Sequence, residues 1–227
     1  MSVGPAVLLA ARALIAGIAF AALGGCAVVG FFGNAIFPEK VKAVYRLADR
    51  STAIVVDDPW NLLDDPALLY EIGHGISVEL VSRHVLAQIV PAEKLVQLAS
   101  RLGDEFDRMP MDRVGKEIGA EQVLHVNIQS VMVGQIRMNL VCQVRVIDVK
   151  RSARLFPAIV QRQGKTSPIA AGTITVELIH RPTSEMSPGT RLMANRELAR
   201  RVSVEVARLF HDHERPKRSD VFGQSAS

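Results

Sequence analysis

The sequence predicts an α/β fold: a two-layer sandwich in which a mixed sheet of about four to five strands carries helices mainly on one face, preceded by a signal peptide and a tether. The prediction rests on a change of hydrophobic period. Between residues 66 and 119 apolar residues recur at helical spacing, and from residue 121 they alternate as in a strand. The 227 residues, 48% of them hydrophobic, are enough for a core of ordinary domain size.

The amino-terminal segment 1–25 is expected to be a signal peptide. Arg12 is its only charged residue, and the thirteen residues 13–25 include no polar side chain. An apolar run of that length is typical of a signal peptide, whereas a membrane span needs about 20 residues. A retained membrane helix over residues 13–36, interrupted only by Asn34, stays open as the alternative.

The run ends in Leu23, Gly24, Gly25 and Cys26, which resemble the lipobox of bacterial lipoproteins. The resemblance implies that the Cys26 thiol receives a diacylglycerol group and that signal peptidase II cleaves before Cys26. It also implies acylation of the new amino group, for example by palmitate. In proteobacterial lipoproteins the next position, Ala27 here, is compatible with sorting to the outer membrane when it is not acidic.

Residues 26–49 are expected to form the lipidated tether and lead-in to a domain over residues 50–212. The domain opens with a short buried strand, "STAIVVDD", which Pro59 ends. Asp65 is expected to cap a helix that has Pro66 at its first position and continues to about Leu86. A single helical stripe is formed by Leu69, Ile72, Ile76 and Leu80.

A very short apolar stretch, "AQIV", is expected to form the next strand, and Pro91 ends it. Two helices follow, "AEKLVQLASRL" with a further turn or two, and "MDRVGKEIG". Gly119 closes the second of these helices as a left-handed cap.

The second half of the domain is predicted to contribute three strands and a helix. In "EQVLHVNIQSVMV" an apolar face alternates with a wet face that includes His125, residues 138–149 alternate similarly after a hairpin, and "TITVELIH" forms the third strand. Cys142 shares a face with Leu140, Val144 and Val146, so it is expected to be buried and inert. The final helix carries a stripe of Leu192, Ala199, Val202, Val206 and Leu209, and residues 213–227 follow as a polar, disordered tail.

The element order and the phrase "IGAEQVLHVNI" resemble a group of envelope proteins. The group includes the amino-terminal domain of TolB, the curli-secretion lipoprotein and the lipoprotein activators of penicillin-binding proteins. In this group such a phrase closes a helix and opens a central strand, so the resemblance implies packing roles for the matched residues: Ile118, Gly119, Ala120, Glu121, Val123, Leu124, Val126 and Ile128. The chain lacks a long amphipathic insertion of the kind that builds a secretion pore.

The strongest candidate binding site is an acidic rim at the carboxyl end of the first strand. Asp57, Asp58, Asp64 and Asp65 bracket Trp60, at the edge where α/β sheets often bind ligands. Capping and turn formation explain the same acids equally well. We therefore expect Asp57, Asp58 and Trp60 to be the candidate ligand rim.

Other candidates for chemistry are weaker. His211, Asp212 and His213 offer two imidazoles whose i and i+2 spacing points them to different sides of a helix. His74 lies within a predicted helix. The sequence contains no nucleophile elbow, zinc motif, CxxC pair or phosphate loop, so we expect no catalytic residues, no cofactor and no metal. Net charge is only +4 and aromatic residues make up 5%, so nucleic acid is not an expected partner.

Two functional classes remain open. The first is a non-enzymatic lipoprotein of the cell envelope, facing the periplasm, whose α/β domain binds a protein partner and which is anchored through Cys26, in the outer membrane in preference to the inner. The second is a membrane-anchored hydrolase or ligand-binding protein that uses the acidic rim around Trp60. Catalysis needs a nucleophile, a base and an orienting group, whereas binding needs only a surface. The sequence therefore favours the first class and leaves homo-oligomerisation open.

Overall fold

The computed structural model divides into two compact units. The larger unit spans Lys42–Asp212. The smaller unit includes the strands β1 (Lys40–Val41) and β7 (His213–Glu214), which pair antiparallel. The structure describes residues 40–63, 65–133, 137–157, 168–169, 171–179 and 187–215. The expected signal peptide, its retained-helix alternative and Cys26 lie outside these residues.

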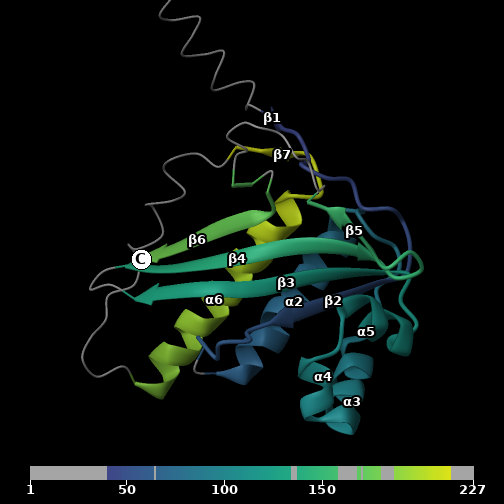
Figure 1. Cartoon of the computed structure of the whole chain (residues 1–227). Coiled ribbons are helices and arrows are strands. Elements are labelled where there is room, and N and C mark those ends of the chain that lie inside the picture. The colour runs from purple at the N-terminus through teal and green to yellow at the C-terminus, as the bar shows by residue number, and fades with distance from the viewer. Residues whose placement is uncertain are drawn as a thin grey trace, which may run out of the picture. The chain divides into compact units, whose positions relative to one another are not determined.

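The larger unit is built on a mixed five-stranded sheet, which confirms the predicted fold class (Figure 1). Strand β2 runs parallel to β3, and β4 pairs antiparallel with β3, β5 and β6. The neighbour order is β2-β3-β4-β5, with β6 also on β4, so β2 is an edge strand. The bounds are β2 Thr52–Asp57, β3 Gln122–Val133, β4 Arg137–Asp148, β5 Ala153–Phe156 and β6 Thr173–Ile179.

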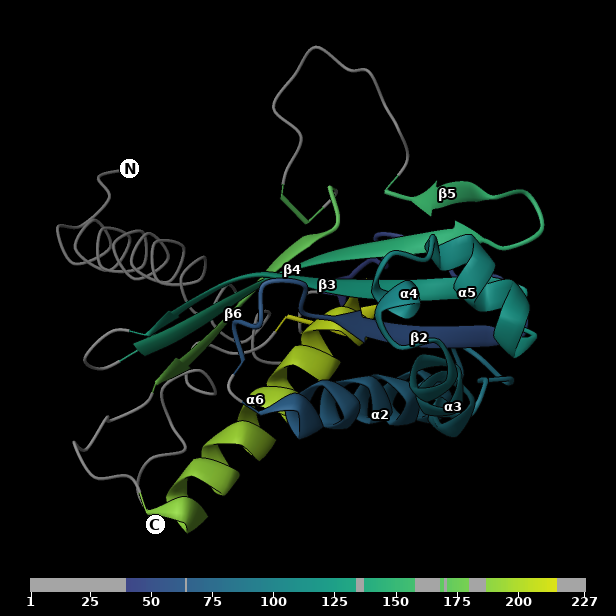
Figure 2. The same cartoon turned by 60° about the horizontal axis from the view of Figure 1, so that its bottom comes forward.

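The two longest helices, α2 (Pro66–Ser82) and α6 (Pro188–Arg208), pack on one face of this sheet (Figure 2). The start of α2 agrees with the prediction, because the Asp65 carboxylate accepts the Ala67 N–H at 3.0 Å. Alternate residues of β3 and β4 face these helices and are buried in the main core, among them Leu124, Val126, Ile128, Leu140, Cys142, Val144 and Val146.

Three shorter helices form a second, smaller core on the other face of the sheet. They are α3 (Ala92–Leu102), α4 (Asp104–Asp107) and α5 (Met111–Ile118), and their buried residues pack against Ala53, Val55 and Val123. Gly119 ends α5 with a φ of 75°, as predicted for a left-handed cap. The helices therefore cover both faces of the sheet, whereas the sequence predicted two layers with helices mainly on one face.

The last residues of the expected lead-in pack against the domain. Tyr45 and Leu47 contact the main core, and the Tyr45 ring lies 5.4 Å from that of Phe156. The N–H groups of Val44 and Tyr45 donate to the Leu209 carbonyl at 2.8 and 3.0 Å. Chain entry and the end of α6 are therefore joined within the larger unit.

The structure corrects several predicted elements. Helix α2 ends at Ser82 instead of Leu86, because the chain turns at His84, whose φ is 54°. The stretch "AQIV" makes only an isolated bridge between Ile89 and Thr52, and β5 was not predicted. Leu192, expected in the buried stripe of α6, is 44% exposed. None of the helices in the described ranges combines the length and hydropathy that a membrane span needs.

Candidate functional site

The three residues of the expected ligand rim, Asp57, Asp58 and Trp60, lie in different environments. Asp58 is buried, and its Oδ2 accepts the Leu63 N–H at 2.8 Å, which holds the turn after β2. The side chain of Trp60 is 72% exposed. Asp64 lies outside the described residues, and Asp65 caps α2. The rim residues therefore do not converge on one ligand, although Asp57 has polar neighbours of its own.

Asp57 contacts two polar side chains of β3. Its Oδ2 lies 3.6 Å from Nε2 of His125 and accepts a hydrogen bond from Asn127 at 3.3 Å. The His125 imidazole lowers the pKa of the Asp57 carboxyl, burial opposes that shift, and Asn127 adds to it. Neither ring nitrogen of His125 has a hydrogen-bond partner among the described residues.

His125 was expected on a wet face, and that expectation is wrong. Its side chain is 6% exposed, and Arg145 of β4 lies directly opposite it in the antiparallel register. The same face of β3 begins with Val123, which belongs to the second core under α5, and only at Gln129 is the side chain exposed. The alternation identified the face correctly, but not that this face stays buried as far as His125.

Asp57 lines a groove along the edge strand, which we call the β2 groove. It has a volume of about 370 Å³ and lies between β2, α2 and α3, with Phe106, Asp107 and Met111 closing one part. Figure 2 shows α2 and α3 next to each other at the β2 edge of the sheet. Its apolar walls include Leu69 and Leu95. Leu69, predicted on the helical stripe of α2, is partly buried against the main core, and its neighbour Leu68 is fully buried.

The backbone of β2 is open toward this groove. Thr52 uses its outward N–H and C=O on Gln88 and Val90, at 3.1 and 2.8 Å. Backbone groups of a strand alternate in direction, so those of Ile54 and Val56 point to the same outer edge. In the described part of the chain, no segment bonds to Ile54 or Val56 across that edge. Four backbone hydrogen-bonding groups therefore face the groove.

The rim of the β2 groove carries exposed apolar and acidic side chains. Tyr70 and Val96 are 48% and 52% exposed, and the Tyr70 ring stacks on His74 at 6.3 Å. Two carboxylates, Asp57 and Asp107, line the groove, and its lining includes no lysine or arginine. No sequence pattern indicates this groove, because whether a strand edge is open depends on which strands pair.

Asp212, from the candidate group at residues 211–213, has a structural role. The Asp212 carboxylate accepts the Ala43 N–H at 2.9 Å and pairs with Lys42 at 3.3 Å. The described residues include no group of three or more potential metal ligands. Cys142 is a free, buried thiol, as predicted, and burial raises its pKa to about 12.

Comparison with known proteins gives distant structural likeness only. No family model and no curated protein sequence matches the chain. Lipoprotein GNA1162 from Neisseria meningitidis is 10% identical with a TM-score of 0.39, covering 67% of this chain and 96% of that one. A PelC dodecamer from Paraburkholderia phytofirmans is 11% identical with a TM-score of 0.39, covering 77% and 98%. The hypothetical protein CT253 from Chlamydia trachomatis is 14% identical with a TM-score of 0.39, covering 69% and 92%.

Proposed function

We propose that the chain is a non-enzymatic lipoprotein of the cell envelope, anchored through Cys26, and that its α/β domain binds a partner protein along the β2 groove. The observation that carries the binding role is the open edge of β2 inside an apolar groove. The lipobox resemblance at residues 23–26 supports the anchor, and Ala27 supports the outer membrane over the inner.

The occupant that fits the groove is an extended segment of the partner. Unpaired N–H and C=O groups of an edge strand bond best to another extended backbone, because the spacing of the groups matches. Ile54 and Val56 offer two donors and two acceptors in that spacing. A helix, whose backbone groups bond internally, leaves them unsatisfied.

The walls and charges of the groove define the side chains of that segment. Leu69 and Leu95 line the groove from α2 and α3, so alternate residues of an added strand face apolar surface. Asp57 and Asp107 favour a lysine or arginine in the segment. We therefore propose an extended segment with alternating apolar residues and one basic residue.

The alternative of a hydrolase or small-ligand protein at the acidic rim has less support. Asp58 already accepts a backbone hydrogen bond in the turn, and Asp57 contacts two side chains of its own sheet. These contacts are what turn formation and sheet packing need. No observation near Trp60 favours catalysis over them.

A random twelve-residue peptide library selected against the purified full-length chain tests the binding role. Val96 lines the groove and Val78 does not, yet both are 52% exposed, so Val96→Asp and Val78→Asp form a matched pair. We expect selected peptides to alternate apolar residues and to include a basic one. Their affinity should fall at least tenfold with Val96→Asp and stay unchanged with Val78→Asp, because only the first places a charge in the apolar wall.

Backbone methylation separates strand addition from simple hydrophobic contact. Peptides methylated on the alternate amides that face β2 should lose at least tenfold in affinity, and methylation of the other amides should have little effect. A selection whose peptides ignore Val96→Asp, or tolerate both methylation patterns, contradicts the proposal. The chain could instead bind no peptide and form concentration-dependent dimers that Val96→Asp abolishes. That result assigns the β2 edge to a second copy of the chain and also overturns the proposal.

A further inference from the structure

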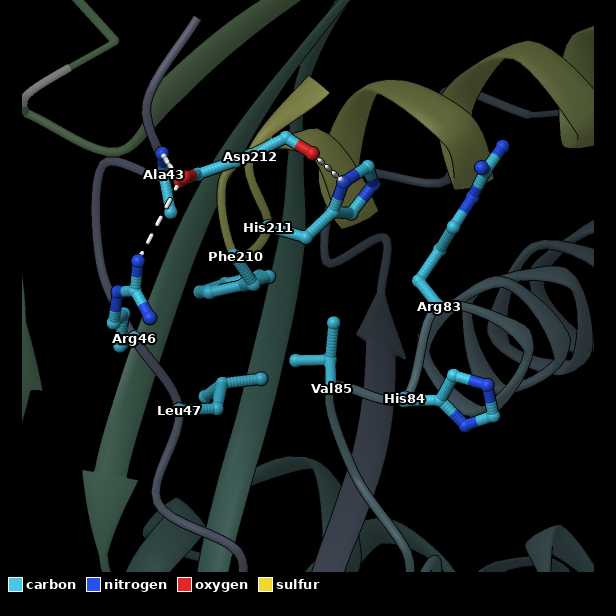
Figure 3. A pocket seen from close by; sticks show the side chains of 9 residues that line it. All are labelled: Ala43, Arg46, Leu47, Arg83, His84, Val85, Phe210, His211 and Asp212. Carbon is cyan, nitrogen blue, oxygen red and sulfur yellow. Dashed lines mark hydrogen bonds and ion pairs between the residues drawn. The ribbon is translucent and has the colours of Figure 1, made fainter.

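A second pocket, lined by different residues, lies where the chain enters the larger unit. It has a volume of about 480 Å³, within the range of small-molecule sites. Three segments line it: 43–47 of the lead-in, 83–85 after α2, and 210–212 after α6. Figure 3 shows Leu47, Val85 and Phe210 between Arg46 on one side and Arg83 with His84 on the other. We call this the entry pocket.

The charge around the entry pocket is positive. Asp212 is already engaged, because it accepts the Ala43 N–H and pairs with Lys42 and Arg46 at 3.3 and 3.7 Å. The Ala43 N–H and the Lys42 ammonium accordingly lower the pKa of this carboxyl.

Arg83 pairs only loosely with Glu79, at 3.8 Å, and its side chain is 59% exposed. Among the residues that line the pocket, two arginines therefore stand against one carboxylate, Asp212. Both Arg46 and Arg83 lie on the pocket rim, where a guanidinium can turn toward an anion.

The floor of the pocket is apolar. Phe210 is 3% exposed, and Leu47 and Val85 pack against the main core from its edge. A free inorganic anion makes no use of such a floor. A ligand that carries an anionic group next to hydrocarbon satisfies both the rim and the floor.

We infer that the entry pocket binds the phosphodiester headgroup of an anionic phospholipid, with Arg46 and Arg83 on the phosphate and the upper part of an acyl chain on the half-buried Leu47 and Val85. The lead-in wall begins at Ala43, seventeen residues after Cys26. An extended tether of that length reaches at most about 60 Å, so an anchored chain can hold the pocket at a membrane surface. This site is independent of the β2 groove.

Native mass spectrometry of the full-length chain in a neutral detergent tests the inference. The probes are phosphatidylglycerol and phosphatidylcholine with identical acyl chains, and inorganic phosphate. We expect one phosphatidylglycerol per chain, retained about tenfold more strongly than phosphatidylcholine, because the choline cation opposes the two arginines.

Variants and competition decide among the sources of the anion. Arg83→Gln should weaken phosphatidylglycerol retention about tenfold. Arg101→Gln is the matched control, since Arg101 also makes one exposed ion pair, with Glu117, and is 65% exposed outside the pocket.

Equal retention of the two lipids, or equal loss in both variants, overturns the inference. Displacement of the lipid by inorganic phosphate at equal concentration assigns the pocket to a free anion and overturns it as well. Either result leaves the peptide selection at the β2 groove unaffected, so the two proposals fail separately.

Discussion

Asp58 shows how a residue that resembles a ligand-site acid can instead maintain the local fold. Its side chain is buried, one oxygen accepts the Leu63 N–H at 2.8 Å, and the other, Oδ1, has no partner in the described part of the chain. The Asp58 carbonyl also accepts the Asn61 N–H at 3.0 Å. The carboxylate therefore fixes the chain between β2 and α2.

Replacing this carboxylate should affect stability in proportion to the hydrogen bond that remains. Asp58→Ala leaves the Leu63 N–H unpaired and should lower the free energy of unfolding by about 1–2 kcal/mol. Asp58→Asn retains an accepting oxygen and should cost less. Urea unfolding followed by circular dichroism measures both, with the exposed Asp107→Ala as a control expected within about 0.5 kcal/mol. A stability of Asp58→Ala equal to that of the control contradicts the turn role.

At the residue scale, local signals were the predictable ones. Asp65 and Gly119 act through their own neighbours in sequence, so their capping roles could be read from the chain. The burial of His125 could not, because its neighbours Asp57 and Arg145 lie on other strands and are distant in sequence. The same holds for the Asp57–His125 contact, which arises only from the parallel pairing of β2 with β3.

At the scale of elements, the close approach of α2 and α6 determines how the main layer packs. The Ser203 hydroxyl on α6 donates a hydrogen bond to the Ala199 carbonyl at 2.7 Å. The same hydroxyl oxygen lies 3.1 Å from the Ile72 carbonyl oxygen on α2. A side chain at Gly75 would overlap the Ser203 hydroxyl. At Gly73, two residues earlier, an added Cβ meets only Val56, at an ordinary contact distance of 3.4 Å.

These two glycines should respond oppositely to alanine. Gly75→Ala forces α2 and α6 apart and should lower the free energy of unfolding by about 1–3 kcal/mol. Gly73→Ala has room for the methyl group and should raise it by up to about 1 kcal/mol, because alanine loses less conformational entropy in a helix. Thermal and urea unfolding of both variants provide the test. Equal destabilisation would falsify the assigned helix contact.

Helices and strands could be predicted where a hydrophobic pattern is long. They could not be predicted where a short stretch becomes a strand only by pairing with its neighbours. The strands β3 and β4 and the helices α2 and α6 were predicted as elements of the right type, since each pattern runs for many residues, although the burial of single positions such as His125 and Leu192 was not. The four-residue strand β5 was missed, and "AQIV" forms a single bridge, because such short stretches are defined by their neighbours. For the same reason the open edge of β2, on which the binding proposal rests, had no sequence signal.

At the scale of the whole molecule, the fold of the compact unit and the proposed anchor rest on different kinds of sequence signal. The unit Lys42–Asp212 has its own cores on both faces of the sheet. Its fold class followed from the sequence, because period and element order are properties of the chain. The proposed anchor rests on a four-residue resemblance at residues 23–26, outside the described residues. Under that proposal the β2 groove and the entry pocket lie close to a membrane.

The two cysteines of the chain allow a direct test of that anchor. Cells expressing the full-length chain and fed an alkyne analogue of palmitate should label the wild type. Cys26→Ser should lose the label and accumulate a precursor longer by the 25 leader residues, because cleavage follows lipidation of the thiol. Cys142→Ser is the matched control: its thiol is buried with a pKa near 12, so labelling should persist. Label retained in Cys26→Ser contradicts lipidation at Cys26. An unlabelled wild type of full length in the membrane contradicts the lipoprotein and favours the retained helix over residues 13–36.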